Sequence, residues 1–432
     1  MNGAGLIEAL LAGTLDDLEG GRLHVSTRSV VIAPSLARGE AELVRALDLG
    51  RHFALVSDPT THAVLGERVE RALGSLGRVD PIRLPEVPHA DLMTVAWLEP
   101  HIKMADAIIA VGSGTINDLC KLAAFRQGKP YVVFATAPSM NGYTSTNASI
   151  TAHGHKKSFA AQAPLGVFID LGVFAAAPAR MIRAGLGDSL CRPTAQADWL
   201  LAHLLLERPY REVPYRLLAA DEVTLITEPE ALLAGDLDAM AALARTLILS
   251  GFGMTICGGS EPASQGEHLI SHYVDMLGDP AWPEAFHGEQ IGVTTLTMAR
   301  LQHAMLDGPV PELAPDGPDE AALIAHYGPE LGRSCWKEFA KKRLDVARAE
   351  RLNERLASGW DEIRERIAAI TLPEERLRTV LARAGAPRTP EELGWPRAFY
   401  RGAVQHAREI RDRYTFLDLA ADSGFFARGF EP

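Results

Sequence analysis

Two histidines stand four residues apart in "GEHLISHYVDM", and this spacing places His268 and His272 on one face of a helix. Asp188, in "RAGLGDSL", is a carboxylate among small and apolar residues, and a buried carboxylate needs a partner. His287 begins a further apolar helix in "FHGEQIGV". One aspartate and two or three histidines from separate helices can form a metal site with three protein ligands and an open position for a substrate oxygen.

Two other interpretations bear on these residues. Each histidine, taken singly, could instead cap or pack its helix. The HxxxH spacing also resembles half of the HExxH motif of metalloproteases. Leu269 stands where that motif requires its general base, Glu, so a protease is disfavoured.

The stretch "AIIAVGSGTINDLCK" is an apolar strand followed by a glycine-rich turn and a helix. Gly112 and Gly114 would let backbone amides approach a pyrophosphate at the helix N-terminus, where the helix dipole favours anions. The spacing is GxGxxN, without the third glycine of the dinucleotide fingerprint. An ordinary strand-to-helix turn therefore remains an equal alternative.

Asp58 ends an earlier apolar run in "ALVSDPTTH". A carboxylate there can accept hydrogen bonds from an adenine ribose diol and repel an additional 2′-phosphate, which would favour NAD over NADP. Asp58 or Thr60 could equally serve as the N-cap of the helix that follows.

The elements that must position these residues change in type along the chain. From about residue 29 to residue 170, apolar runs alternate with amphipathic helices, which predicts a mostly parallel sheet covered on both faces. Ligands bind outside the carboxyl ends of the strands of such sheets. The runs are "SVVIAP", "HFALVSD", "DPIRLPE", "ADAIIAVGSG", "PYVVFATAPS" and "PLGVFIDL".

Beyond about Phe174 the apolar residues recur at helical spacing, and no further strand is expected. Residues 331–393, with "WKEFAKKRLDVARAERLNERLASGWDEIRERIAAI", are highly charged and predict a solvated helical insertion.

The composition is typical of a soluble globular protein with room for two domains: 432 residues, 47% hydrophobic and 23% charged. The formal net charge of -12 disfavours a nucleic-acid surface. The four cysteines form no CxxC pair, which argues against a zinc ribbon or a disulfide scaffold. The N-terminus predicts a short helix without a basic start, and no uninterrupted apolar run of about 20 residues occurs, so we expect a cytoplasmic protein without membrane insertion.

Five motifs in order, "VGSGTINDLCK", "TAPSMNGYTS", "GLGDSL", "SQGEHLISHYVDM" and "FHGEQIGV", resemble those of the sn-glycerol-1-phosphate dehydrogenases. That family belongs with the dehydroquinate synthases, glycerol dehydrogenases and iron-containing alcohol dehydrogenases. The resemblance covers about residues 29–305 and resumes in "HAREIRDRYTFLDLAADSG". It implies a dehydroquinate synthase-like fold of class α/β plus all-α. A Rossmann-like nucleotide-binding domain, residues 1–173, would precede a helical metal- and substrate-binding domain, residues 174–432, with a cleft between them.

The resemblance also assigns residues to the cofactor and the metal. The metal ligands would be Asp188, His268 and His287, and His272 would contact the substrate. We expect NAD or NADP, with NAD favoured by Asp58, and one divalent metal, Zn²⁺ before Ni²⁺ or Fe²⁺. The pyrophosphate and nicotinamide would be bound by Gly112, Ser113, Gly114, Thr115, Ile116, Asp118, Thr136, Ala137, Pro138, Ser139 and Ser145.

The implied reaction is reversible hydride transfer between NAD(P) and a small ketone phosphate such as dihydroxyacetone phosphate. Asp188 and His272 would carry the chemistry, the latter as a hydrogen-bond or proton donor. The family usually has Asp where this chain has Asn141. In the family that Asp helps to bind the polar end of the substrate. For the phosphate we nominate Lys156 and Lys157, with His155 as a further candidate.

Three alternative functions remain open beside this dehydrogenase interpretation. A dehydroquinate synthase-like cyclase or lyase would use the same NAD and metal, although that group places Glu at the position of Asp188. A polyol dehydrogenase would act on an unphosphorylated substrate. A non-catalytic sensor of NAD or sugar phosphate would have no need of an open metal site. We expect a homo-oligomer.

Overall fold

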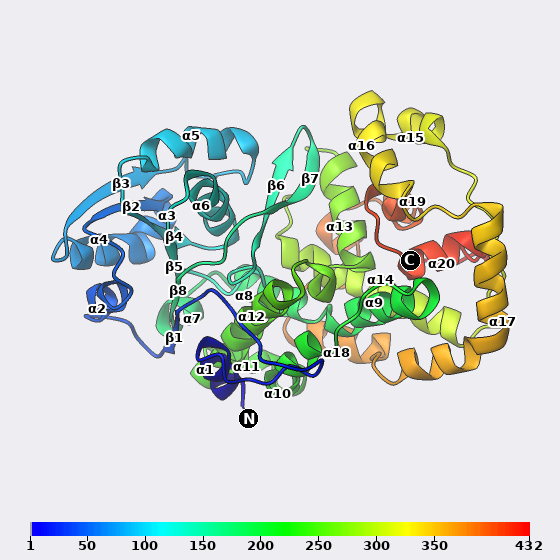
Figure 1. Cartoon of the computed structure of the whole chain (residues 1–432), viewed down its shortest axis with the longest axis horizontal. Coiled ribbons are helices and arrows are strands. Elements are labelled where there is room, and N and C mark those ends of the chain that lie inside the picture. Colours follow the sequence, from blue (N-terminus) through cyan, green and yellow to red (C-terminus); the bar gives the residue numbers. More distant parts are fainter. Residues whose placement is uncertain (1) are drawn as a thin grey trace. The chain divides into compact units, whose positions relative to one another are not determined.

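A computed structural model describes residues 2–432 and contains both parallel-sheet and helical regions (Figure 1). The strands are β1 Ser29–Ala33, β2 His52–Ser57, β3 Arg78–Arg83, β4 Ala107–Gly112, β5 Tyr131–Ala135, β6 Asn147–Ala152, β7 His155–Ala160 and β8 Gly166–Asp170. The helices of the first half are α1 Gly3–Leu11, α2 Glu40–Arg45, α3 Pro59–Thr61, α4 Glu67–Leu73, α5 Leu92–Ile102, α6 Gly114–Gln127, α7 Leu171–Ala175, α8 Ala179–Ser189, α9 Arg192–Leu206 and α10 Val213–Thr227.

The remainder of the described chain is helical. Its α-helices are α11 Pro229–Leu233, α12 Leu237–Cys257, α13 Gly266–Leu277, α14 His287–Leu306, α15 Glu320–Tyr327, α16 Pro329–Phe339, α17 Val346–Ala368, α18 Glu374–Arg383, α19 Arg397–His406 and α20 Phe416–Asp422. The short π and 3₁₀ turns are η1 His62–Gly66, η2 Glu261–Ala263, η3 Glu391–Leu393, η4 Ala407–Ile410 and η5 Phe426–Arg428.

The six predicted strands are confirmed, and they form one parallel sheet in the order β1-β8-β5-β4-β2-β3. From β2 the chain goes outward to β3 and then returns to the other side of β2 to form β4. The direction of winding therefore reverses between the carboxyl ends of β2 and β4, which is where open α/β sheets bind their ligands.

The central strands β2, β4, β5 and β8 are buried on both faces, which explains why they are nearly continuous apolar runs in the sequence, whereas the edge strands β1 and β3 are only partly buried. Alternate residues, such as Phe53 and Leu55 on β2 and Ile109 and Val111 on β4, pack with apolar residues of α2 and α4 in one cluster. Helices α5 and α6 pack against each other, and α6 also contacts β4 and β5 (Figure 1).

Strands β6 and β7 pair with each other in a separate two-stranded sheet that the apolar pattern did not predict. Their sequence, "NASITAHGHKKSFA", contains too many polar and small residues to predict buried strands. The link is the dipeptide His153–Gly154, and both residues have positive φ angles of 52° and 74°, which are typical of a tight hairpin turn.

The described chain divides into two compact units. Unit 1 comprises residues up to 152, 156–189 and 212–260, and unit 2 comprises 153–155, 190–211 and 261–432. In this division α8, α10, α11 and α12 group with the sheet. The assignment of a nucleotide domain and a metal domain on either side of the expected boundary at residue 173 stays a prediction.

The charged stretch 331–393 is helical, as expected, but it is not only a solvated surface. Its apolar residues recur at helical spacing and pack into the core of unit 2. In α17 the buried set includes Leu352, Leu356, Trp360 and Ile363. Most charges of this stretch lie on the outer faces of helices that the core requires, but Lys342 is buried.

The motif "HAREIRDRYTFLDLA" supplies a buried ion-pair cluster in unit 2. Arg408 donates to Asp422 and to Asp316, and it also lies near Asp418, which pairs with the buried Lys342. Burial lowers the pKa of the Arg408 guanidinium, but the three nearby carboxylates raise it, and their effect is the larger one. Removing one partner from such a cluster would leave an uncompensated buried charge, so this motif holds η4 and α20 together.

Helix α12 is long and apolar enough to cross a membrane by length and composition alone. In the structure 78% of its most apolar window is buried, and it packs against α10. We therefore interpret α12 as a core helix of unit 1.

Candidate functional site

The glycine turn after β4 presents backbone amides at the start of α6. Ser113 is the N-cap of α6 in an extended conformation, and the first helical bond runs from the amide of Asn117 to the carbonyl of Ser113, 3.0 Å. The preceding amides of the first turn have no acceptor within the helix. A Cβ on Gly114 would lie 3.0 Å from Met140 Cγ, so the turn and the loop after β5 are closely apposed.

Three predicted cofactor residues lie at the carboxyl ends of adjacent strands. Asp58 follows β2, Gly112 ends β4 and Thr136 follows β5, with the Thr136 amide 3.2 Å from the Gly112 carbonyl. The N-cap interpretation of Asp58 is confirmed, because its Oδ1 accepts from the Thr61 amide at 2.7 Å. The ribose role of Asp58 stays a prediction.

The loop of residues 136–147, which carries the predicted nicotinamide residues, is tied to α6 by one buried lysine. Lys121 is 0% exposed, and its Nζ donates to the Gly142 carbonyl at 2.6 Å, the Ser145 hydroxyl at 3.0 Å and the Asn147 carbonyl at 3.0 Å. Burial lowers the pKa of Lys121 from 10.5 to about 8, although the nearby Asp118 opposes this shift. The lysine therefore anchors the second half of the loop to α6.

Two helices hold the same loop from the other side. A Cβ on Gly185 of α8 would lie 1.7 Å from the Pro138 carbonyl oxygen, so only glycine permits this approach. Thr144 donates through Oγ1 to the Ile248 carbonyl of α12 at 2.6 Å. A Cβ on Gly251 would lie 2.3 Å from the Thr144 hydroxyl. Packing thus requires glycine at position 185 of "RAGLGDSL" and at position 251 of α12.

Asp188 lies one turn beyond Gly185 on α8, and its Oδ2 accepts a hydrogen bond from the Asn141 amide at 2.8 Å. The Asp188 side chain is completely buried. Position 141, whose side chain was predicted to contact substrate, therefore contributes its backbone to the orientation of this carboxylate. The substrate contact of the Asn141 side chain stays a prediction.

His268 and His272 lie one turn apart on α13, and His287 is the first residue of α14. Their ring centroids are 5.1 Å apart for His268 and His287, 6.1 Å for His268 and His272, and 6.2 Å for His272 and His287. The three imidazoles therefore form one cluster.

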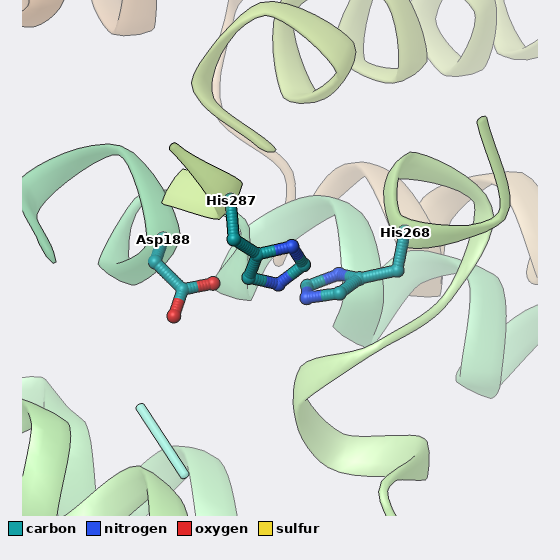
Figure 2. Close-up of side chains that lie close together, drawn as sticks. All are labelled: Asp188, His268 and His287. Atoms are coloured by element: carbon teal, nitrogen blue, oxygen red, sulfur yellow. The ribbon is translucent and has the colours of Figure 1, made fainter. Parts of the chain in front are cut away.

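Asp188, His268 and His287 converge from three helices (Figure 2). Each offers one ligand atom, and these three atoms lie within 4.8 Å of one another. One carboxylate oxygen and two imidazole nitrogens suit Zn²⁺, Fe²⁺ or Ni²⁺, and three protein ligands are the usual number in a catalytic site with an open position. The residues present thus fit a single divalent metal.

Two buried carboxylates that sequence reasoning missed fix the start of α13. Glu267 accepts from the Gln265 amide at 2.8 Å, and Asp198 accepts from the Gly266 amide at 2.9 Å. Asp198 also accepts from the Phe416 amide at 2.9 Å. Burial, reinforced by the negative charge of Glu267, raises the pKa of Asp198 to about 8.

The remaining predicted residues lie on α6 and β7. Asp118 accepts from the Ser149 amide at 3.0 Å, so it joins α6 to β6, and burial raises its pKa. Lys156 and Lys157 are adjacent residues of β7 and therefore point to opposite faces of the hairpin. His155 Nδ1 is 2.9 Å from the Ser334 hydroxyl. The cofactor role of Asp118 and the phosphate role of the lysines stay predictions.

The supporting residues left only weak signals in the sequence. Glu267 directly precedes His268, and a carboxylate next to a candidate ligand is a usable signal for an orienting partner. Lys121 follows Asp118 by one helical turn, a spacing that allows the two side chains to pair, and their charged atoms lie 3.7 Å apart. Asp198 had no signal comparable to these.

Comparison with known proteins gives matches to one group of dehydrogenases. Residues 31–178 match the family described as iron-containing alcohol dehydrogenase. A glycerol-1-phosphate dehydrogenase [NAD(P)+] of Pyrococcus horikoshii is 35% identical over 63% of this chain and 78% of its own length. The Bacillus subtilis protein of the same name is 29% identical over 92% of each chain. The second alignment is long enough to include most of the charged stretch 331–393.

Solved structures with the same fold are more distant in sequence. Glycerol dehydrogenase from Schizosaccharomyces pombe has a TM-score of 0.63 at 17% identity, with 95% of this chain and 91% of that chain covered. A probable glycerol dehydrogenase from Sinorhizobium meliloti has a TM-score of 0.60 at 16% identity, with 94% and 98% covered. At these identities the likeness shows the fold, and it confirms the predicted class of a parallel-sheet region followed by helices.

Proposed function

Because the chain belongs to the glycerol-1-phosphate dehydrogenase family, we propose that it catalyses the reversible, NAD(P)-linked interconversion of dihydroxyacetone phosphate and sn-glycerol 1-phosphate. In the reducing direction the ketone carbon gains a hydride and its oxygen gains a proton, while NAD(P)H becomes NAD(P)⁺. The relatives in this family carry that activity and cofactor in their names.

The observation that carries the proposal is the convergence of Asp188, His268 and His287, with ligand atoms within 4.8 Å of one another. A ketone reductase needs a positive group that polarises the carbonyl and stabilises the negative charge that develops on its oxygen. A divalent metal held by these residues, with Zn²⁺ favoured, supplies that Lewis acidity. The Asn141 amide keeps the Asp188 carboxylate in place for this role.

We propose that His272 is the residue that donates a proton or a hydrogen bond to the substrate. Its ring lies within 6.2 Å, centroid to centroid, of both candidate metal-binding imidazoles, and it is not part of the group of potential metal ligands around Asp188. A neutral or protonated imidazole at this place can donate a hydrogen bond or a proton to a hydroxyl of the substrate.

The cofactor is proposed to bind along the carboxyl ends of β2, β4 and β5. The amides of the turn at residues 112–116 would cradle the pyrophosphate, and Asp58 would accept from the adenine ribose, which favours NAD. Residues Thr136, Ser139 and Ser145 of the loop 136–147 would line the nicotinamide. Asp118 would also belong to the cofactor site. The nicotinamide supplies the hydride in the reducing direction.

The phosphate of the substrate is proposed to pair with a lysine of β7. Lys156 and Lys157 point to opposite faces of the strand, so each must be replaced singly to find which one acts. Asn141 keeps a donor and an acceptor for the polar end of the substrate but brings no charge. The proposal further places the protein in the cytoplasm as a homo-oligomer.

The test is metal analysis followed by NADH and NADPH oxidation with a panel of ketones. We expect one divalent metal per chain, turnover with dihydroxyacetone phosphate well above that with dihydroxyacetone, and loss of turnover after chelation that Zn²⁺ restores. A lasting, stoichiometric fall in NADH absorbance distinguishes a dehydrogenase from a cyclase that regenerates its NAD within each turnover. Turnover only with an unphosphorylated ketone would refute the proposed substrate.

A further inference from the structure

His268 belongs to two groups of potential metal ligands at once. The first contains Asp188 and His287, and the second contains Cys191 and Glu267, and in each group the ligand atoms lie within 4.8 Å of one another. An imidazole has two ring nitrogens on different edges, so one ring can serve both groups. The second group could hold a further metal, or it could be a hydrogen-bonding set that supports the first.

The contacts of Glu267 favour the hydrogen-bonding set. Its Oε1 lies 2.8 Å from His268 Nδ1 and accepts from the Gln265 amide at 2.8 Å, while Oε2 is 3.4 Å from the Thr194 hydroxyl. An ionised carboxylate only accepts hydrogen bonds, so the ring nitrogen facing it carries the proton. This places the proton of a neutral His268 on Nδ1 and makes Nε2 the nitrogen that can bind a metal.

The position of Glu267 is itself fixed by the first turn of α13. Asp198 accepts from the Gly266 amide through Oδ2, and through Oδ1 from the Phe416 amide, 2.9 Å each. A Cβ on Gly266 would lie 2.7 Å from Asp198 Oδ2, so this residue must be glycine for the carboxylate to approach. Glu267 is completely buried, so its carboxylate depends on the hydrogen bonds of these neighbouring groups.

Cys191 has a different environment from Glu267. Its Sγ lies 3.8 Å from the Ala263 carbonyl oxygen, which is a geometry for a weak thiol donor. A metal bound to this second group would require loss of the thiol proton and of the Nδ1 proton of His268. The Glu267 contact uses that Nδ1 proton, so the hydrogen bond and a second metal exclude each other.

We propose that Glu267 is a positioning residue of the metal site: its buried carboxylate fixes the tautomer and the ring orientation of His268, so that Nε2 binds the single metal. The inference rests on the metal-dependent function proposed above, but its test needs neither substrate nor cofactor. Partners of this kind raise the basicity of a histidine ligand, and their loss typically weakens metal affinity by about 10- to 100-fold.

The test measures metal binding by variants of the full chain. Stoichiometry is determined by elemental analysis, and Zn²⁺ affinity by competition with a chromophoric chelator. We expect Glu267→Ala to weaken Zn²⁺ binding by about 10- to 100-fold. Glu267→Gln, which keeps an acceptor oxygen, should weaken it less. Cys191→Ala is the matched control, and it should bind one Zn²⁺ with unchanged affinity.

The visible spectrum of the Co²⁺-substituted protein separates orientation from mere folding. If Glu267 orients the ligand, the d–d bands change in Glu267→Ala and largely return in Glu267→Gln, while Cys191→Ala leaves them unchanged. Wild-type affinity and spectrum in both Glu267 variants would overturn the proposal. Two metals per chain, or a thiolate-to-cobalt charge-transfer band that Cys191→Ala removes, would overturn it in favour of a second metal site.

Two further outcomes are informative. If Glu267→Ala does not fold, Glu267→Gln and its cobalt spectrum still decide the matter, because the amide preserves the volume and an acceptor. If Zn²⁺ binding depends on Glu267 as expected but dihydroxyacetone phosphate is not turned over, the proposed function fails while this inference stands.

Discussion

The loop 136–147 and the start of α13 are both held by buried groups, but different parts of each are fixed. Helices α6, α8 and α12 fix the loop mainly through its backbone, by means of Lys121, Gly185 and Thr144. The start of α13 offers the His268 ring, which Glu267 fixes directly.

This difference determines which substitutions each region tolerates. A backbone-built site loses its shape when packing or a crosslink is changed, whereas the side chains along it can vary. A side-chain-built metal site loses its function when any ligand is removed, even where the fold is unaffected. The comparison predicts separable losses of cofactor binding and of metal binding.

The largest expected effect comes from removing a metal ligand. His287→Ala should abolish stoichiometric metal binding and lower kcat by more than ~100-fold, because the electrophilic stabilisation of the developing oxyanion is lost. NADH binding, measured by calorimetry in the absence of substrate, should be unchanged. A parallel loss of NADH affinity would break the proposed separation of the two regions.

The matched control for this prediction lies on the same helix. His303 is also on α14, and its Nδ1 is bonded to the Ala299 carbonyl at 2.8 Å. His303→Ala should retain the metal and most of the activity. Loss of the metal in this variant would indicate that any histidine change on α14 disturbs the site.

The converse prediction, loss of cofactor binding with the metal retained, concerns Lys121. Lys121→Met removes three buried hydrogen bonds to the loop 136–147, although the Ser145 hydroxyl still donates to the Gly142 and Asn147 carbonyls, and we expect a cost of about 1–3 kcal/mol in total. We expect NADH to bind about 10-fold more weakly, by the same estimate, with metal content unchanged. Reduced metal content with normal NADH affinity would reverse the comparison.

Sequence periodicity predicted those parts of the fold in which burial follows directly from the local order of apolar and polar residues. The central strands of the parallel sheet were predictable because strands covered on both faces must be nearly continuously apolar. The β6–β7 hairpin was missed because most of its residues are polar or small, and only the dipeptide His153–Gly154 marks the turn. The grouping of α10–α12 with the sheet depends on tertiary packing, which no local pattern encodes.

The candidate site was predictable to the extent that residue type implies chemistry. Asp188, His268 and His287 could be selected from spacing and resemblance, and the structure brings their ligand atoms together. Lys121 and Asp198 escaped notice because their partners, such as Asn147 and Phe416, are distant in the sequence. The fold is needed to show which distant groups such supporting residues contact.

Glycine substitutions give a prediction of intermediate size. Gly185→Ala places a Cβ 1.7 Å from the Pro138 carbonyl oxygen, and relief of such a clash costs about 1–3 kcal/mol. We expect a lower midpoint of urea unfolding and weaker NADH binding, because the loop must move. Gly359 is the control, since a Cβ there meets nothing within 4 Å. Gly359→Ala, within α17, should stabilise the protein by about 0.5–1 kcal/mol.

The smallest expected effects compare two buried threonines, one in the loop 136–147 and one on α14. Thr144 donates to the Ile248 carbonyl at 2.6 Å, whereas the Thr295 hydroxyl on α14 has no hydrogen-bond partner among the described residues. Valine has nearly the same shape as threonine, so Thr144→Val should cost about 1 kcal/mol by removing a buried hydrogen bond. Thr295→Val removes an unpaired polar group and should be neutral or stabilising by less than about 1 kcal/mol. Equal destabilisation in urea titrations would mean that the Thr295 hydroxyl has a partner in solution, and that α14 also depends on a polar anchor there.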